Sequence, residues 1–519
     1  NCDIDSLFNL LTAAGSVREL VLFDNNLHGL QPMEITPAPS LETLHLHNCG
    51  LENSDIVPLF ALLLAAGSVE NVTLSGNFLH DLRPIKMAPV PSVQTLRIEE
   101  CCLTKGDIGP LFTLLSAVSN LKELLLVRNN LHGLQPTKIS PAPSMQTLTL
   151  SECGLTNSDI EPLFTLLAAG SVKNLCLLND KLHDLQPIKI SPVPSLQKLN
   201  LHGCSLTNRD IEPLFNLLLA AGNVKDLSLH GNNLHMLQPI KISPVPSLQK
   251  LHLEECNLKN RDIEPLFNLL SAAGSVKILD LVTNNLHMLQ RMAIDPVPSI
   301  QTLNLVQCGL ENSDIESLFD LLSAAGNVKE LVLFRNNLHG LQPVAITRVP
   351  SLQTLQLPSC GLTHSDIKAL FSLISAAGSV EKLTLADNYL HDLQSMKIAA
   401  VPSLQTVHLQ ECSLTKSDID PLFTLLSAAC NLKELVLVRN NLHELQPTTI
   451  APVPSMQTLK LVECGLTNSD IESVFILLSA VGNVNELIVV DNNLHELQPM
   501  EITPVPSLQE LHIQECGLT

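Results

Sequence analysis

Aromatic residues are scarce in this chain of 519 residues, which has no tryptophan, one tyrosine (Tyr389) and 13 phenylalanines. Hydrophobic residues still make up 45% of the sequence, so leucine, isoleucine and valine must build the core. Charged residues account for only 16%, and this composition excludes a disordered chain. Because the chain is too long for one ordinary globular core, we expect either several domains or a repeat array.

Long apolar runs are also missing, since none approaches the roughly 18–20 residues that a membrane span needs. We therefore expect no membrane insertion in this segment. The sequence starts without an initiator methionine or a signal peptide, and both of its ends fall inside a repeat. These features predict that the 519 residues are part of a longer protein.

Basic residues are outnumbered, with 30 lysines and arginines against 51 aspartates and glutamates and a formal net charge of −21. Most of such a surface would repel a nucleic-acid duplex or an anionic membrane, so we expect no nucleic-acid partner. A basic protein partner is favoured instead. The alternative is that the net charge only keeps a long repeat protein in solution.

What the chain does have is a repeat of 52 residues, with one step of 51 between Cys153 and Cys204. Such a period determines the architecture, and we expect a single solenoid of about ten double repeats over residues 1–519. The cysteines that mark the register are Cys49, Cys101, Cys153, Cys204, Cys256, Cys308, Cys360, Cys412, Cys464 and Cys516.

Each 52-residue repeat contains two copies of the pattern L-x-x-L-x-L-x-x-[N/C]-x-L. Residues 17–27 form the copy with asparagine and residues 41–51 the copy with cysteine, and the alternation in each predicts a short strand with one buried face. A helix is expected after the cysteine strand, as in residues 156–172, with Ser158 and Glu161 as its capping box and Gly170 as its stop. After the asparagine strand, three prolines in residues 28–40 favour an extended path.

Alternation of L-x-x-C-G-L-T and L-x-x-N-N-L strands resembles the ribonuclease-inhibitor type of leucine-rich repeat. That type is also found in the sensor ends of nucleotide-binding, leucine-rich-repeat immune receptors. The resemblance implies an α/β solenoid shaped as a curved horseshoe, with a parallel sheet on the concave face and a protein-binding function. Here helices are expected in alternate repeats only, which predicts gentler curvature than in a solenoid with a helix in every repeat.

Residues that recur in every repeat are interpreted as structural. The asparagine at the strand exit, such as Asn25, is expected to satisfy backbone groups, although Asp180 replaces it once. A histidine follows three residues later in each repeat, as at His28, and is expected to hydrogen-bond to the loop backbone. The aspartate of the SDI motif opens each helix, where the helix dipole favours it. We therefore expect no metal site, no cofactor and no catalytic residues.

The ten repeated cysteines are predicted to be buried, reduced thiols, because neighbours two layers apart lie beyond the reach of a disulfide. Reduced thiols favour a reducing compartment such as the cytoplasm. One glycosylation sequon at Asn71 leaves secretion open.

Function is expected at positions that differ between repeats, and these cluster on the outward face of the strands. In the asparagine strands they are often apolar, whereas in the cysteine strands they are polar or acidic, so alternating stripes are predicted. Neutral drift on a tolerant surface is the alternative. The predicted partner-binding residues are Val21, Phe23, His45, His47, Arg97, Glu99, Leu125, Val127, Arg128, His252, Glu254, Val332, Phe334, Arg335, Val436, Val438, Arg439, Ile488 and Val490.

Three functions are compatible with these patterns. The first is a recognition module, in particular the sensor region of an innate-immune-type receptor. The second is an inhibitor-like binder of one basic protein, whose affinity would depend strongly on salt. The third is a structural or self-assembling solenoid, since neither end carries a visible polar cap. An enzyme is not expected.

Overall fold

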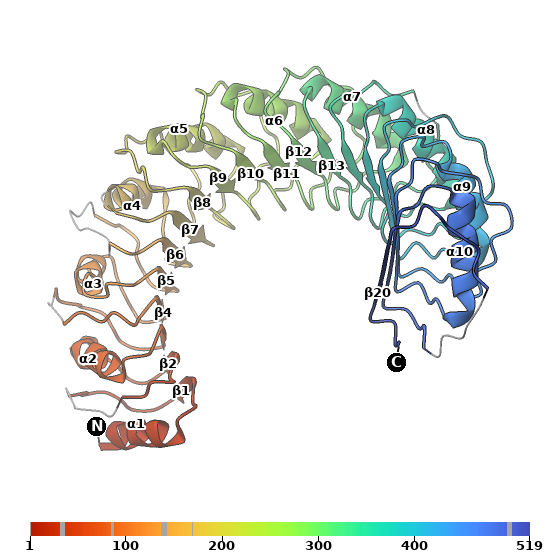
Figure 1. Ribbon diagram of the computed structural model, residues 1–519. Helices are drawn as coiled ribbons and strands as arrows, with labels where there is room; N and C mark the ends of the chain where they lie inside the picture. The colour runs from red at the N-terminus through yellow and green to blue at the C-terminus, as the bar shows by residue number, and fades with distance from the viewer. Residues whose placement is uncertain are drawn as a thin grey trace. The chain divides into compact units, whose positions relative to one another are not determined.

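The computed structural model describes residues 2–31, 37–84, 88–135, 143–168, 170–343, 345–495 and 501–518. These residues form two compact units, an N-terminal unit of Asn1–Cys256 and a C-terminal unit of Asn257–Thr519. Within each unit, the strands lie side by side on one face and the helices on the other (Figure 1). This confirms the predicted α/β leucine-rich-repeat solenoid, while its continuity over all 519 residues stays a prediction.

The N-terminal unit carries ten strands that pair in chain order, all of them parallel. The strands are β1 (Glu19–Phe23), β2 (Thr43–His47), β3 (Asn71–Ser75), β4 (Thr95–Glu99), β5 (Glu123–Val127), β6 (Thr147–Ser151), β7 (Asn174–Leu178), β8 (Lys198–Asn200), β9 (Asp226–Ser228) and β10 (Lys250–His252). The helices are α1 (Cys2–Ala14), α2 (Ile56–Ala66), α3 (Ile108–Leu115), α4 (Ile160–Leu167) and α5 (Ile211–Ala221), with 3-10 turns η1 (Asn53–Asp55), η2 (Asn157–Asp159) and η3 (Asn208–Asp210).

The C-terminal unit repeats this arrangement with ten more parallel strands in chain order. The strands are β11 (Ile278–Asp280), β12 (Thr302–Asn304), β13 (Glu330–Val332), β14 (Thr354–Gln356), β15 (Lys382–Thr384), β16 (Thr406–Gln410), β17 (Glu434–Val438), β18 (Thr458–Val462), β19 (Glu486–Val490) and β20 (Glu510–Gln514). The helices are α6 (Asn260–Ala273), α7 (Ile315–Ala325), α8 (Ile367–Ala377), α9 (Ile419–Leu426) and α10 (Ile471–Val481), with turns η4 (Asn312–Asp314), η5 (His364–Asp366), η6 (Lys416–Asp418) and η7 (Asn468–Asp470).

In the described residues, leucines of the strands and one phenylalanine from each of the nine helices α1 to α9 fill the core between sheet and helices. The strand leucines Leu303 and Leu305 are buried, and Phe319 of α7 is fully buried behind them. No single repeat could cover these side chains by itself, so stacking of successive repeats creates the core. In the described ranges, no helix combines the length and the apolar character that crossing a membrane requires.

The start of α4 differs from the prediction. Thr156, in extended conformation, is the residue before the first helical turn, and its backbone N–H donates to the Asp159 carboxylate at 2.8 Å. The predicted capping pair of Ser158 and Glu161 is therefore wrong. The true pair lies two residues earlier because η2 precedes α4, and Asp159 also accepts a hydrogen bond from Leu134 of the preceding loop.

The end of α4 also differs from the prediction. In α5 the helix ends at Gly222, whose φ of 87° places it in the left-handed conformation that favours glycine. In α4 the cap is Ala168 in right-handed conformation, and Gly170 lies two residues beyond it. Gly170 is thus not the cap in this repeat, which is one residue shorter than the others. The predicted extended path of residues 28–40 lies partly outside the described residues, but the matching residues 183–195 contain neither helix nor strand.

The ten repeated cysteines, which we call the cysteine ladder, should differ sharply in reactivity from the exposed cysteines. Cys308 is fully buried with its Sγ donating to the carbonyl oxygen of Leu281 at 3.0 Å, and burial raises its pKa to about 12. Cys102 and Cys430 are exposed. Since the thiolate is the reactive form, we expect a thiol-specific aromatic disulfide reagent at pH 8 to modify Cys102 and Cys430 within minutes and to leave the ladder unmodified until denaturant is added. Peptide mapping of the labelled residues checks this, and fast labelling of Cys308 in the native protein would contradict it.

Candidate protein-binding surface

Side chains of the strands alternate between the core and the solvent, and the outward ones line up in rows across neighbouring strands. In the C-terminal unit one such row is apolar and lies two residues beyond the ends of the five consecutive strands β11 to β15. It consists of Val282, Val306, Phe334, Pro358 and Ala386, all half-buried, and we call it the apolar row.

Backbone hydrogen bonds fix the register of the apolar row. The N–H groups of Thr283, Gln307, Arg335 and Ser359 donate to the carbonyl oxygens of Val306, Phe334, Pro358 and Ala386, at 2.9, 2.8, 3.0 and 2.8 Å. Each side chain of the apolar row is therefore the direct neighbour of the next. The sheet holds five apolar side chains together on a surface that faces the solvent.

The matching row in the N-terminal unit is mixed. It begins with Phe23 and His47 and ends with His202, His230 and Glu254. The rings of His202 and His230 lie 4.5 Å apart between centroids, and Nδ1 of His230 lies 3.1 Å from the Glu254 carboxylate. This surface is therefore polar and ionic where its counterpart in the C-terminal unit is apolar.

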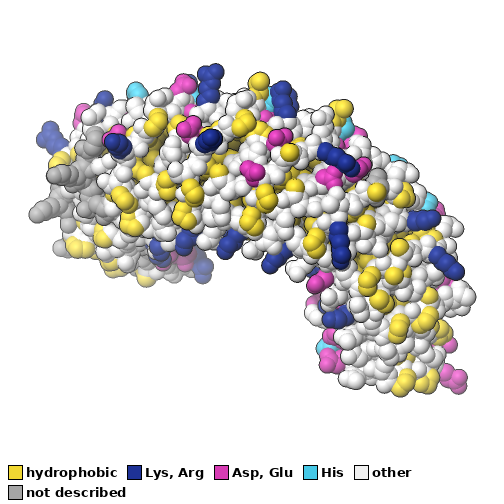
Figure 2. Space-filling view, turned by 90° about the horizontal axis from the view of Figure 1, so that it is seen from above, with side chains coloured by type: hydrophobic (Ala, Val, Ile, Leu, Met, Phe, Trp, Pro, Cys, Tyr) yellow, Lys and Arg dark blue, Asp and Glu magenta, His cyan; other side chains and the backbone are white. Residues whose placement is uncertain are grey.

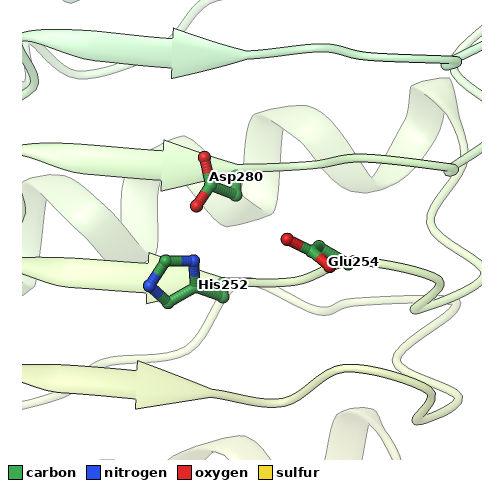
Figure 3. Close-up of side chains that lie close together, drawn as sticks. All are labelled: His252, Glu254 and Asp280. Carbon is green, nitrogen blue, oxygen red and sulfur yellow. The ribbon is translucent and has the colours of Figure 1, made fainter.

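A shallow hollow of about 580 Å³ lies on the strand face of the N-terminal unit, over β7 to β10. Its lining includes His252, Glu254 and Asp226, and Nε2 of His252 lies 3.2 Å from the Asp226 carboxylate. His252 is the last residue of β10, and Glu254 lies two residues further along the chain (Figure 3). The hydrogen bond from His252 lowers the pKa of Asp226, so this carboxylate stays ionised to lower pH than usual.

The predicted partner-binding residues face outward, but not all are exposed. Val21 and Phe23 are 51% and 61% exposed, and Phe23 lies 6.3 Å from the ring of His47. Val127 and Val436 are only 8% and 9% exposed, so their prediction as exposed apolar residues is wrong. The cross-strand neighbours of Val436 are the larger side chains of His408 and Lys460, one on either side. The half-buried ones are His45, His47, Arg97, Glu99, Leu125, His252, Glu254, Val332, Phe334, Val438, Ile488 and Val490.

The predicted alternation of apolar and acidic stripes is also wrong in the C-terminal unit. Val306, Pro358 and Val462 stand in cysteine strands, at the position two residues before the ladder cysteine, and none is polar. Val306 and Pro358 flank Phe334, which belongs to an asparagine repeat, so the apolar row runs across asparagine and cysteine repeats alike. Comparing that one position in all ten repeats would have found them in the sequence.

The three predicted arginine anchors follow strands in matching positions but have different surroundings. Arg128 donates to Glu100 and Glu152 at 3.1 and 3.2 Å. Arg439 does the same with Glu411 and Glu463, at 3.0 and 2.9 Å, and these bonds raise the pKa of its guanidinium. Arg335 instead stacks on the ring of Phe334, with its Cζ 4.9 Å from the ring centroid.

The recurring polar residues have the structural roles that their repetition indicated, with one change of partner. The Asn77 amide donates to Leu46 and Ser75 while its oxygen accepts from Cys49 and Leu51, which confirms the predicted role of the asparagines. The predicted pairing of the histidines with the loop backbone is wrong in six described repeats. There Nδ1 of the histidine lies within 3.5 Å of the buried SDI aspartate of the next repeat, as in His28 and Asp55 at 3.3 Å.

One group in the C-terminal unit has the composition of a metal site. Glu486, Glu510 and His512 offer ligand atoms that all lie within 4.8 Å of one another. Nε2 of His512 lies 3.6 Å from Glu486 and 3.3 Å from Glu510, which are also the distances of ordinary ion pairs on a strand face. Figure 2 shows lysine and arginine side chains interspersed with acidic, apolar and uncharged ones, several of them along the lower edge of the view.

Comparisons with known proteins agree with the repeat pattern. Residues 195–217 match the family model described as Leucine Rich Repeat. A ribonuclease inhibitor from Sus scrofa is 28% identical over 67% of this chain and 83% of its own length. The human NACHT, LRR and PYD domains-containing protein 5 is 26% identical over 63% of this chain, which corresponds to 29% of that protein. The crystal structure of the mouse RP105/MD-1 complex aligns with 82% of this chain and 76% of its own, at 18% identity and a TM-score of 0.44.

Proposed function

Because the chain is a leucine-rich-repeat protein of the ribonuclease-inhibitor-like type, a family of protein-binding scaffolds, we propose that it recognises a protein partner through the outward face of its strands. The observation that carries this proposal is the apolar row of the C-terminal unit. Five neighbouring strands present apolar side chains to solvent there, whereas the framework side chains beneath them are buried. A contiguous apolar surface of this kind is typical of interaction sites.

Charge favours a basic partner for the remainder of the face. The chain has a net charge of −21, and Asp226, Glu254 and Glu255 lie together over β9 and β10 of the N-terminal unit. Acidic surfaces attract and orient basic proteins, and the effect weakens with salt. An inhibitor-like binder of one basic protein is therefore the second candidate, and the similarity to a ribonuclease inhibitor supports it.

The similarity to NACHT, LRR and PYD domains-containing proteins supports the first candidate, a recognition module that forms part of a larger receptor. The buried, reduced cysteines favour a reducing compartment for either function. Self-association through the apolar row is the third candidate.

The experiment that tests the proposal compares three immobilised forms of the chain and quantifies the retained proteins by mass spectrometry. Phe334→Asp places a charge in the apolar row, and Leu219→Asp is the matched control on an exposed position of α5. We expect partners that the wild type and the control retain and that Phe334→Asp loses at least tenfold. Equal retention by all three forms would contradict a role of the strand face.

The same experiment separates the three candidates. Elution of a single basic protein by raising the salt concentration favours the inhibitor-like function. A partner that stays bound at high salt favours a recognition module that binds through apolar contacts. Retention of free copies of this chain favours self-association, which light scattering would then measure as a concentration-dependent molar mass.

A further inference from the structure

We propose that the apolar row and Arg335 together form a binding site for an extended, acidic segment of a partner protein, in which a glutamate or aspartate side chain pairs with Arg335. This inference rests on the proposed function and adds the chemistry of the bound segment. It concerns the C-terminal unit alone, where Val282, Val306, Phe334, Pro358 and Ala386 lie next to one another.

The dimensions of the apolar row suit an extended peptide. Neighbouring strands are about 4.8 Å apart, so five strands span about 19 Å, the length of about six residues in extended conformation. Alternate side chains of such a peptide face the same way and lie about 6.7 Å apart, so three of them span about 13 Å and fit within the length of the apolar row. Pro358 and Phe334 offer rigid side chains, which lose little conformational entropy when a partner covers them.

Arg335 differs from its two counterparts in the same chain. Arg128 and Arg439 each lie between two glutamates, one on each neighbouring strand. At the matching positions beside Arg335 the chain has Gln307 and Ser359, which are uncharged. Over the described ranges, no carboxylate lies within ion-pair distance of Arg335, and its guanidinium is exposed.

The surroundings hold this guanidinium in place for a ligand. The backbone of Arg335 has a φ of 57°, in the left-handed region that non-glycine residues adopt only at a cost. The Arg335 side chain stacks on the ring of Phe334. A stacked arginine keeps its N–H groups free at the edge of the plane, where a carboxylate accepts two of them. In a chain with a large excess of acidic residues, an uncompensated arginine beside an apolar row indicates an acidic ligand group.

The neighbouring charges indicate where the ligand carboxylate lies. Asp387 follows β15, one strand beyond Ser359, and its carboxylate is 3.4 Å from the Ser359 hydroxyl. A second carboxylate on that side would be repelled. The ligand group therefore approaches Arg335 from the side of Gln307, whose amide can donate a further hydrogen bond.

The test uses fluorescein-labelled peptides of seven residues with leucine at positions 2 and 6, serine at the odd positions, and glutamate, glutamine or lysine at position 4. The variable side chain then faces the same way as the two leucines. Binding to the full chain is measured by fluorescence polarisation. We expect the glutamate peptide to bind about tenfold more tightly than the glutamine peptide, as one charge-assisted contact provides, and the lysine peptide to bind most weakly.

Three variants identify the contact. Arg335→Gln should abolish the preference for glutamate, while Arg439→Gln, whose wild-type guanidinium is already paired, should retain it in full. Phe334→Ala should weaken all three peptides by a similar factor. Equal affinity for glutamate and glutamine in the wild type, or an unchanged preference in Arg335→Gln, would overturn the inference.

Failure of this inference can be told apart from failure of the proposed function. If the peptides show no glutamate preference while Phe334→Asp still loses captured partners, only the inference fails. If Phe334→Asp retains every partner, the strand face is not the binding surface, whatever the peptides do.

Discussion

Replacement of Asp180 by asparagine should stabilise the N-terminal unit by about 2–3 kcal/mol at pH 7.5. Asp180 takes the place of the recurring asparagine at the strand exit, in the repeat that is one residue shorter than the others. Its Oδ1 accepts from the backbone N–H of Leu155 at 3.0 Å, but among the described residues Oδ2 has no hydrogen-bond partner. A buried acceptor without a donor destabilises the fold, and an amide at this place would supply donors instead.

The pKa of Asp180 gives the pH dependence of this effect. Burial raises the pKa from 3.8 to about 6. Above pH 6 the carboxylate is ionised in both the folded and the unfolded chain, so the full penalty applies. Between pH 6 and pH 3.8 the folded chain binds the proton first and gains stability as the pH falls. At 1.36 kcal/mol per unit of pKa, the penalty above pH 6 amounts to about 3 kcal/mol.

Urea denaturation of the wild type and Asp180→Asn at pH 7.5 and pH 4.5 measures this effect. The gap between the two midpoints should be wide at pH 7.5 and narrow at pH 4.5. The reverse change, Asn129→Asp, is the matched control, because Asn129 donates to Ile98 and Val127 in the neighbouring repeat. It should lower stability at pH 7.5 by a similar amount. A gap that does not change with pH would show that the carboxylate charge is not the cause.

Removal of the SDI aspartate should have the opposite and larger effect. Asp418 is fully buried and accepts hydrogen bonds from the backbone N–H groups of Leu393 at 2.9 Å and Thr415 at 2.8 Å, and from the ring of His391 at 3.2 Å. Asp418→Ala leaves the buried N–H group of Leu393 and the half-buried N–H group of Thr415 without acceptors. Since each unsatisfied group costs about 1–3 kcal/mol, we expect a loss of about 3–5 kcal/mol.

Hydrogen exchange locates the consequence of Asp418→Ala. The amides of Leu393 and Thr415 should exchange at least a hundredfold faster, because a solenoid can open locally while distant repeats stay folded. The matched control is Asp295→Asn, which removes a carboxylate charge from an exposed position. Its exchange pattern and urea midpoint should equal those of the wild type. If Asp418→Ala also leaves both unchanged, the hydrogen bonds of Asp418 do not support the fold.

The fold could be predicted because each of its causes is local and repeated. Leu44 and Leu46 alternate with outward residues, and a left-handed glycine such as Gly222 ends the helix in repeats that have one at this position. The sequence did not reveal hydrogen bonds between residues of neighbouring repeats. The spacing of Ser158 and Glu161 satisfied the rule for a capping box, but the rule contains nothing about Leu134, which shares Asp159 with Thr156.

The candidate surface was harder to predict, because exposure depends on cross-strand neighbours. Val436 and Phe334 both alternate correctly, yet Val436 lies between two long side chains and is buried. Phe334 lies between Val306 and Pro358 and remains half-exposed. Similarly, Arg439 and Arg335 follow the same strand pattern, and only the residues one strand away distinguish a paired guanidinium from a free one.

The hydrogen bonds of the recurring residues also determine which deletions the fold can accommodate. Asn77 contacts the cysteine strand that precedes it, and Asp55 contacts the loop before its own helix, so each repeat contributes half of every such contact. Deleting 52 residues between equivalent positions would join complementary halves and preserve all of them. A cut that does not remove a whole number of repeats would leave mismatched halves at the junction. We therefore expect that gene splicing can shorten or lengthen this protein without loss of folding only by whole repeats.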